Sequence, residues 1–237
     1  MSMAENIYPG SARENCFANI YCEIAMESYY NATASYKQIK EAEYSWDYYG
    51  EYDSMNKSVV STIVFSAMAI EAFINDYAAA CLGDLDFYDN FDKLSLFGKF
   101  ELIARFILKS GRLDKGEACY YRLKSLVKLR NLYVHCKSRS LSIRGYSLDE
   151  IQKIKCWDTL KQEPPLLDAT EIENNMNEAL DALKAIRDVA VYFDEHDSNI
   201  WAISRLFNTV GLVAGKENER QYKADVFQLL GIKVGEL

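Results

Sequence analysis

The chain has 237 residues, of which 49% are hydrophobic and 26% are charged, and its formal net charge is −8. This composition is that of an ordinary globular protein, and the length suffices for one large domain or for one domain with an appendage. Three prolines and eleven glycines are too few for a turn-rich β architecture and favour long helices. The acidic net charge, taken alone, argues against a nucleic-acid partner.

The sequence contains no evident secretion signal or membrane span. The N-terminal residues include Glu5 and Glu14 and lack an apolar core. The longest uncharged stretch, from Ser58 to Ile70, is shorter than a bilayer requires. None of the six cysteines has the spacing of a zinc or redox motif, so we expect them to be small buried hydrophobes in a reduced protein. A cytoplasmic protein that does not enter a membrane is the resulting expectation.

The predicted elements are all helical. In chain order they are a long helix over residues 12–48, a turn at Gly50–Asn56, a helix ending at Ala80, an acidic loop over Gly83–Asp92, and helices over Lys93–Lys109, Asp114–Cys136 and Ala169–His196. One or two shorter helices follow, with glycines as breaks. We therefore expect an all-α fold, with a helical bundle over residues 12–196 and a helical appendage over residues 197–237, which could pack on the same bundle.

One helical stretch carries an arginine where an apolar residue is expected. At 100° per residue, Leu126, Val127, Tyr133 and Val134 form a narrow apolar arc, and Arg130 falls in its middle. A guanidinium in such a place is costly unless it is paired or binds an anion. Asn131 and His135, four residues apart, share one face at the edge of this arc.

The same region concentrates positive charge. Residues 118–148 contain seven Lys and Arg side chains and no acidic residue, so the rest of the chain carries a net charge of −15. One interpretation is a patch that attracts phosphate, with Lys124, Lys128, Lys137 and Arg139 as RNA-binding residues. The other is a solvated helix face that forms salt bridges with an acidic neighbour.

A second segment supplies a partner for the arginine. Glu71 and Asn75 are four residues apart and lie beside apolar positions, and a carboxylate there is a natural partner for the guanidinium of Arg130. Together, the segment Ala69-Ile70-Glu71-Ala72-Phe73-Ile74-Asn75 and the motif Arg130-Asn131-Leu132-Tyr133-Val134-His135 resemble those of the HEPN superfamily, the higher-eukaryote and prokaryote nucleotide-binding helical domains.

The resemblance implies an up-and-down bundle of four or five helices. It also implies a homodimer in which the motifs of two copies face one composite site, and a metal-independent endoribonuclease without a cofactor. Arg130 and His135 would be catalytic, Asn131 would position the phosphate or His135, and Glu71, with Asn75 beside it, would orient Arg130. The family further implies a toxin–antitoxin or phage-defence setting, with a cognate antitoxin or regulatory protein as a partner.

The chemistry of these residue types agrees with this implication. RNA carries its own nucleophile, the 2′-hydroxyl, so the protein has to supply a proton acceptor and a cation. An imidazole titrates near neutral pH and can act as general base or acid. A guanidinium can bind the scissile phosphate and stabilise the charge of its transition state. The expected products are a 2′,3′-cyclic phosphate and a 5′-hydroxyl.

A non-catalytic alternative stays open. In it Arg130 is a structural residue clamped by Glu71, and His135 is an ordinary histidine at a helix end. The chain would then be a HEPN-like helical module that binds a nucleotide, RNA or a protein partner without cleaving it.

Overall fold

The computed structural model describes residues 17–41, 49–82, 90–109, 114–135, 169–197, 199–208 and 217–232. All regular secondary structure in these segments is helical, which confirms the all-α helical bundle. The elements are α1 (Ala18–Glu41), α2 (Tyr49–Leu82), α4 (Leu96–Leu102), a π-helical turn η3 (Ile103–Ile107), α5 (Ala118–Val134), α7 (Ala169–His196), α8 (Ala202–Phe207) and α9 (Glu217–Leu230).

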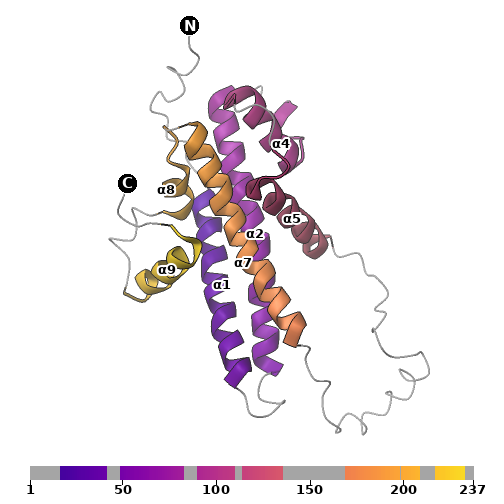
Figure 1. Ribbon diagram of the computed structural model, residues 1–237, viewed down its shortest axis with the longest axis vertical. Helices are drawn as coiled ribbons and strands as arrows, with labels where there is room; N and C mark the ends of the chain where they lie inside the picture. The colour runs from indigo at the N-terminus through magenta and orange to yellow at the C-terminus, as the bar shows by residue number, and fades with distance from the viewer. Residues whose placement is uncertain are drawn as a thin grey trace, which may run out of the picture.

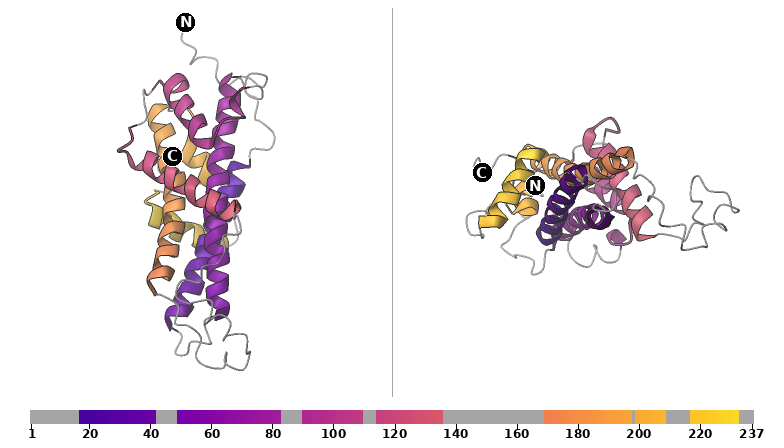
Figure 2. Two further views of the ribbon diagram at one scale, coloured as in Figure 1. Left: turned by 90° about the vertical axis from the view of Figure 1, so that its right-hand side faces the viewer. Right: turned by 90° about the horizontal axis from the view of Figure 1, so that it is seen from below.

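Three long helices form the body of the bundle. The helices α1 and α2 pack along each other, and α7 packs on both of them (Figure 1). On one side α5 packs against α7 and α2, with α4 beside it. On the other side α8 and α9 pack against α1 and α7, and the view from below also separates α9 from α5 (Figure 2). The candidate site on α5 and the C-terminal helices therefore lie on opposite flanks of one bundle.

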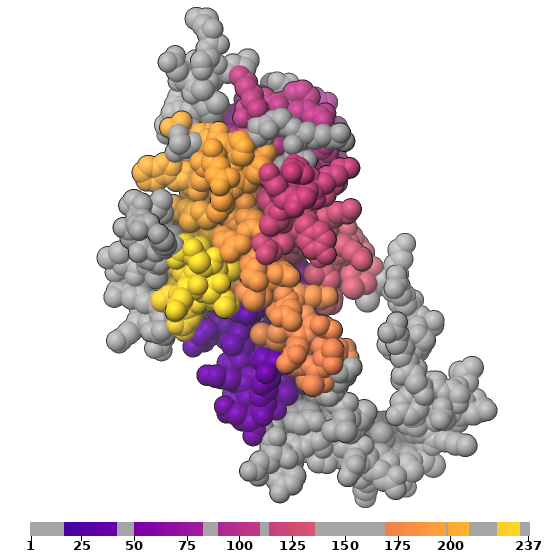
Figure 3. Space-filling view, in the orientation of Figure 1, coloured from indigo at the N-terminus to yellow at the C-terminus, as the bar shows by residue number. Residues whose placement is uncertain are grey.

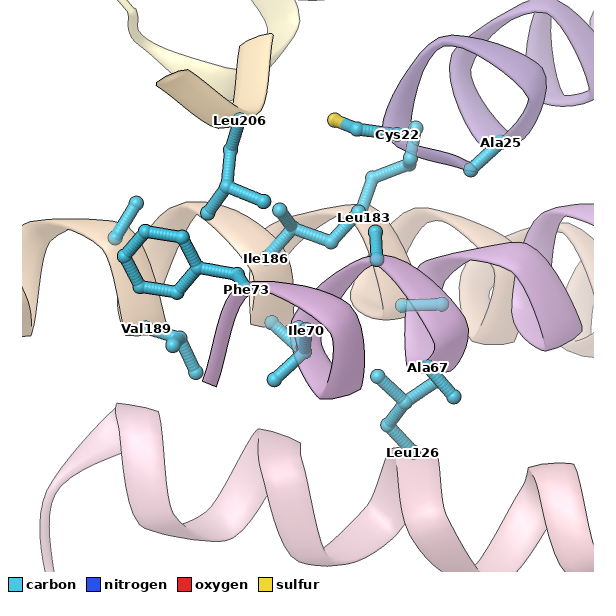
Figure 4. Packing of buried hydrophobic residues seen from close by; sticks show 14 of the residues in the cluster. Cys22, Ala25, Ala67, Ile70, Phe73, Leu126, Leu183, Ile186, Val189 and Leu206 are labelled. Carbon is cyan, nitrogen blue, oxygen red and sulfur yellow. The ribbon is translucent and has the colours of Figure 1, made fainter. Parts of the chain in front are cut away.

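Apolar side chains at helical spacing explain this packing. Ile70 and Phe73 of α2 lie between Leu126 of α5 and the α7 residues Leu183, Ile186 and Val189, while Cys22 and Ala25 of α1 and Leu206 of α8 close the other side (Figure 4). The ring of Phe193 meets Phe73 and Tyr77 edge to face, with centroids 4.9 and 5.0 Å apart. The burial of these side chains is the main force that holds the helices together.

The start of α2 corrects the sequence prediction. The turn expected at Gly50–Asn56 is wrong, because α2 is helical from Tyr49 onward. Met55, Val59 and Ile63 are fully or almost fully buried at four-residue spacing, so this apolar stripe continues the helix to its N-terminal end. Gly50 lies in the first turn, where no neighbouring atom comes within 4 Å of its Cβ position.

The expected helix over Lys93–Lys109 is shorter and irregular. It begins at Leu96, where the Ser95 hydroxyl caps it by accepting a hydrogen bond from the Gly98 N–H at 3.2 Å. It then widens into the π-helical turn η3, and Lys109 beyond it adopts a positive φ of 55°. The helix expected over Asp114–Cys136 begins at Ala118, after a turn in which Asp114 accepts a hydrogen bond from the Gly116 N–H.

The prediction of α7 is correct at both ends, since the helix spans Ala169–His196. Two shorter helices follow it, as expected. The Asp194 carboxylate accepts hydrogen bonds from the backbone N–H groups of Ala202 and Ile203 and so fixes the start of α8. Arg187 donates to the Leu230 carbonyl at 2.9 Å and ties the end of α9 to α7.

The structure describes three of the six cysteines and one helix with an apolar stretch of membrane-spanning length. Cys22 and Cys119 are buried free thiols and Cys81 is half-buried, whereas the other three cysteines lie outside the described residues. Among the described helices, α2 alone is long and apolar enough to cross a membrane, and half of that apolar window is buried in the bundle. The apolar part of this helix is therefore longer than the uncharged stretch from Ser58 to Ile70.

Candidate functional site

The helix α5 is held on the bundle by its N-terminal half. Cys119, Leu123 and Leu126 form its buried stripe. The guanidinium of Arg122 pairs with the Asp188 carboxylate of α7, and its Nε lies 3.8 Å from Asp181. Asp188 is in turn bound by Arg187 at 2.5 Å, so two arginines share one carboxylate. These contacts fix the position and the direction from which the motif residues at the end of α5 project.

Arg130 lies at the edge of the packed interface. Its side chain is 34% exposed, and its NH2 group is 4.0 Å from Oε2 of Glu71 on α2. Its NH1 group donates a hydrogen bond of 3.1 Å to Oδ1 of the neighbouring Asn131. The expected pairing with Glu71 is therefore present but long. Among the described residues, the contact with Asn131 is a hydrogen bond, whereas the contact with Glu71 is an ion pair too long for one, so most of the five guanidinium donors are not engaged.

The apolar arc predicted around Arg130 is only partly buried. Leu126 is buried and Tyr133 half-buried, whereas Val134 is 47% exposed. Val134 is on the predicted apolar arc but is not part of the core of this chain, since the last turn of α5 lies at the rim of the bundle (Figure 1). Leu132 beside it is also exposed, at 52%.

Asn131 and His135 lie on the open face of this last turn. Both are exposed, and their four-residue spacing had predicted that they share a face. His135 is the C-cap residue of α5, and its backbone N–H donates to the Asn131 carbonyl at 3.1 Å. The helix end thus presents a guanidinium, an amide and an imidazole within six consecutive residues, with Arg130 and Asn131 in direct contact.

A lysine that the sequence analysis did not single out completes this region. Lys99 of α4 is only 2% exposed, and its Nζ donates a hydrogen bond of 2.9 Å to Oδ1 of Asn75. The same Nζ lies 3.7 Å from Oε1 of Glu71 and 3.5 Å from Oδ1 of Asp92. Asn75, which we expected to support the site beside Glu71, therefore binds Lys99. Glu71 connects the two cations, one through each carboxylate oxygen.

Lys99 could have been identified from the sequence by the same pattern as Arg130, a charged residue on an apolar helical stripe. Leu96, Phe100 and Ile103 are the buried stripe of their segment, and Lys99 lies on it between Leu96 and Phe100. A charged residue on an apolar stripe indicates a partner across the interface. Its carboxylate and amide partners come from α2 and from the turn before α4, which no local pattern could specify.

The basic stretch divides into two parts. Arg122 bears out the salt-bridged interpretation, because it faces two aspartates of α7. Lys124 and Lys128 are exposed on α5 and stay available to a polyanion. Lys137 and Arg139 lie outside the described residues. In the space-filling view α5 forms the flank of the molecule on one side of α7, away from α9 (Figure 3).

In the part of the chain that the structure describes, no three His, Cys, Asp or Glu side chains come together in a group that could hold a metal ion. The arrangement offers instead a guanidinium for an anion and an imidazole for proton transfer. Searches of the chain against protein-family models, curated proteins and solved structures gave no match. The resemblance to HEPN domains consequently rests on the quoted motifs.

Proposed function

We propose that this protein is a metal-independent endoribonuclease of the HEPN type. The single observation that carries the proposal is the state of Arg130, a half-buried guanidinium held loosely by Glu71 and directly by Asn131 at an exposed helix end that also bears His135. Arg122 pairs with two carboxylates of α7, whereas Arg130 has one carboxylate near it among the described residues, at 4.0 Å. Within the described residues Arg130 makes one side-chain hydrogen bond, which leaves further guanidinium N–H groups available on the open face of the bundle and suits a phosphate ligand.

The proposed reaction is a transesterification within RNA. The 2′-oxygen forms a bond with phosphorus as its proton passes to an imidazole, and the bond to the 5′-oxygen breaks, giving a 2′,3′-cyclic phosphate and a 5′-hydroxyl. His135 is the proton acceptor, and Arg130 stabilises the charge that develops on the phosphate oxygens. Asn131 positions the guanidinium. The leaving oxygen requires a proton, which the His135 of a second copy supplies in a composite site.

The exposed lysines serve this reaction by attracting the substrate. Lys124 and Lys128 follow one another at helical spacing on the same helix as the motif. Because the chain as a whole is acidic, such a local patch selects the surface at which RNA approaches. The proposal includes a homodimer, a cytoplasmic location and a role in toxicity or phage defence with a regulatory partner protein.

The test is RNA cleavage in excess EDTA by purified wild type, Arg130→Ala and His135→Ala. The matched control is His196→Ala, since His196 is the other histidine of the chain and also ends a helix, where its Nδ1 is 2.8 Å from the Tyr192 carbonyl. We expect the wild type and His196→Ala to cleave RNA and the two motif variants to lose at least about 100-fold in rate.

The outcomes separate the two functions considered for this chain. Equal inactivity of all four proteins, with RNA binding retained, supports the non-catalytic binding module. Cleavage that EDTA abolishes contradicts both. Loss of activity in His196→Ala equal to that in His135→Ala would remove the special role of the motif.

A further inference from the structure

The buried cluster around Lys99 deepens the role of the proposed site. Lys99 Nζ is held by oxygens from three side chains, those of Asn75, Glu71 and Asp92, at 2.9, 3.7 and 3.5 Å. These partners come from α2 and from the turn before α4. A cation that is 2% exposed carries a large desolvation cost, which such partners offset. The two carboxylates are the more exposed members, at 36% and 51%, so the cluster opens toward the surface through them.

The carboxylate of Glu71 is shared between two cations. Its Oε1 lies 3.7 Å from Lys99 and its Oε2 lies 4.0 Å from Arg130. A carboxylate anchored on one side has less freedom to turn and close a short, two-pronged contact with the guanidinium, which is the geometry that Arg and carboxylate groups prefer. The long distance to Arg130 is what this sharing predicts.

The charge count points the same way. Lys99, Arg130, Glu71 and Asp92 together are neutral. Without Lys99 the same group carries −1, and Arg130 is its one remaining cation beside Glu71. A phosphate would then meet a guanidinium drawn toward Glu71.

We propose that Lys99 is a positioning residue of the ribonuclease site, which acts by holding Glu71 back so that Arg130 remains available to the RNA phosphate. This inference rests on the proposed function. It assigns Lys99 no contact with RNA, since the side chain is buried. Its effect passes through Glu71 alone, and this makes it testable by a double-mutant cycle.

The experiment compares wild type, Lys99→Met, Glu71→Gln and the double variant. Methionine keeps the length and apolar stem of lysine and removes its charge. The readouts are kcat/KM for RNA cleavage and the Kd for an RNA in which every 2′-hydroxyl is methylated, which binds but cannot react. We expect Lys99→Met alone to lower kcat/KM and to raise this Kd, each by about tenfold. In the Glu71→Gln background the same substitution should change either quantity by less than about twofold.

A matched control guards against a purely structural effect. Lys223 of α9 is also a buried lysine, 9% exposed, whose Nζ lies 2.6 Å from Oε1 of Glu23. The helix α9 lies on the flank of the bundle opposite α5 (Figure 1). Lys223→Met should lower the melting temperature as Lys99→Met does and leave kcat/KM and the Kd unchanged.

Each result decides one of the two proposals. If the wild type cleaves RNA and Lys99→Met lowers kcat/KM by the same factor in both backgrounds, Lys99 is structural and the inference is wrong, while the nuclease stands. If Lys99→Met has no effect on either quantity, the inference is also wrong. If the wild type does not cleave RNA at all, the proposed function fails, and the inference falls with it.

Discussion

Substitution of two arginines of α5, Arg122 and Arg130, distinguishes interactions that stabilise the fold from interactions that serve the site. Arg122 is 26% exposed and pairs with Asp188, whose side chain is 11% exposed, and with Asp181. Arg130 is 34% exposed and has one long ion pair with Glu71 and one hydrogen bond to its neighbour. Each arginine is changed to alanine in turn, in otherwise unaltered protein.

The expected magnitudes follow from these contacts. Hydrogen bonds to charged groups contribute about 1.5–3 kcal/mol when sheltered, and the partial exposure of Arg122 reduces this to about 1–2 kcal/mol. In a chain of this size such a loss lowers the melting temperature by about 2–8 °C. The exposed pair of Arg130 is worth well under about 1 kcal/mol, so Arg130→Ala should shift the melting temperature by less than about 2 °C.

Activity should show the opposite order. Removing a donor that stabilises transition-state charge costs about 10²–10³-fold in rate, so Arg130→Ala should be nearly inactive and Arg122→Ala should retain most of its cleavage. The assays are a thermal melt and RNA cleavage on the same preparations, below the melting temperature of either variant. A large drop in melting temperature for Arg130→Ala would show that Arg130 is structural. Equal loss of activity in both variants would show that the position of α5, and no particular guanidinium, limits cleavage.

Three further outcomes are expected. If the site is shared between two copies, inactive Arg130→Ala and His135→Ala proteins should regain cleavage when they are refolded together, and no gain at any mixing ratio would argue for a site within one chain. Burial raises the pKa of Cys119 to about 12. At pH 8 iodoacetamide should therefore modify this thiol about 10³-fold more slowly than a free thiol, and urea should abolish the difference. Rapid labelling of Cys119 in the native protein, measured by peptide mass, would contradict its burial. Burial also raises the pKa of Glu178. Because its folded-state pKa exceeds the unfolded value, its ionisation lowers stability as the pH rises through that range, so Glu178→Gln should raise the melting temperature at pH 8 and leave it unchanged near about pH 3.5.

Much of the fold follows from local signals in the sequence. The capping-box-like run Asp168-Ala169-Thr170-Glu171, which follows Pro164-Pro165, predicts a helix start there, and α7 begins at Ala169. At α2, Gly50 suggested a turn. The chain is helical there because a continued helix buries Met55 and Val59, and α2 packs against α1. Here the unbroken apolar stripe predicts the extent of the helix better than the glycine near its end does.

The candidate site was predictable in its members and less so in its connections. Arg130, Asn131, His135 and Glu71 were identified from their spacing, and the structure brings Arg130 into contact with both Asn131 and Glu71. A helical wheel gives direction around one helix and says nothing of where that helix reaches the rim of the bundle, so it could not predict that Val134, on the apolar arc, is exposed.

The remaining connections join segments far apart in the sequence. Lys99 meets Glu71 only because α4 folds back onto α2, and Asp188 meets Arg122 only because α7 packs on α5. Such pairs depend on the tertiary arrangement, so the spacing of charges along the chain could not identify the partners of Lys99 or of Arg122.

The chemistry of the cleaved ends tests the ribonuclease proposal most directly. An RNA with a single preferred cut should yield, in EDTA, a fragment whose mass carries a 2′,3′-cyclic phosphate and a second fragment with a 5′-hydroxyl, and a single 2′-deoxy substitution before the cut should block cleavage without weakening binding. Fragments with a 5′-phosphate, or undiminished cleavage of the deoxy-substituted RNA, would show that the 2′-oxygen is not the nucleophile and would contradict the roles assigned to Arg130 and His135.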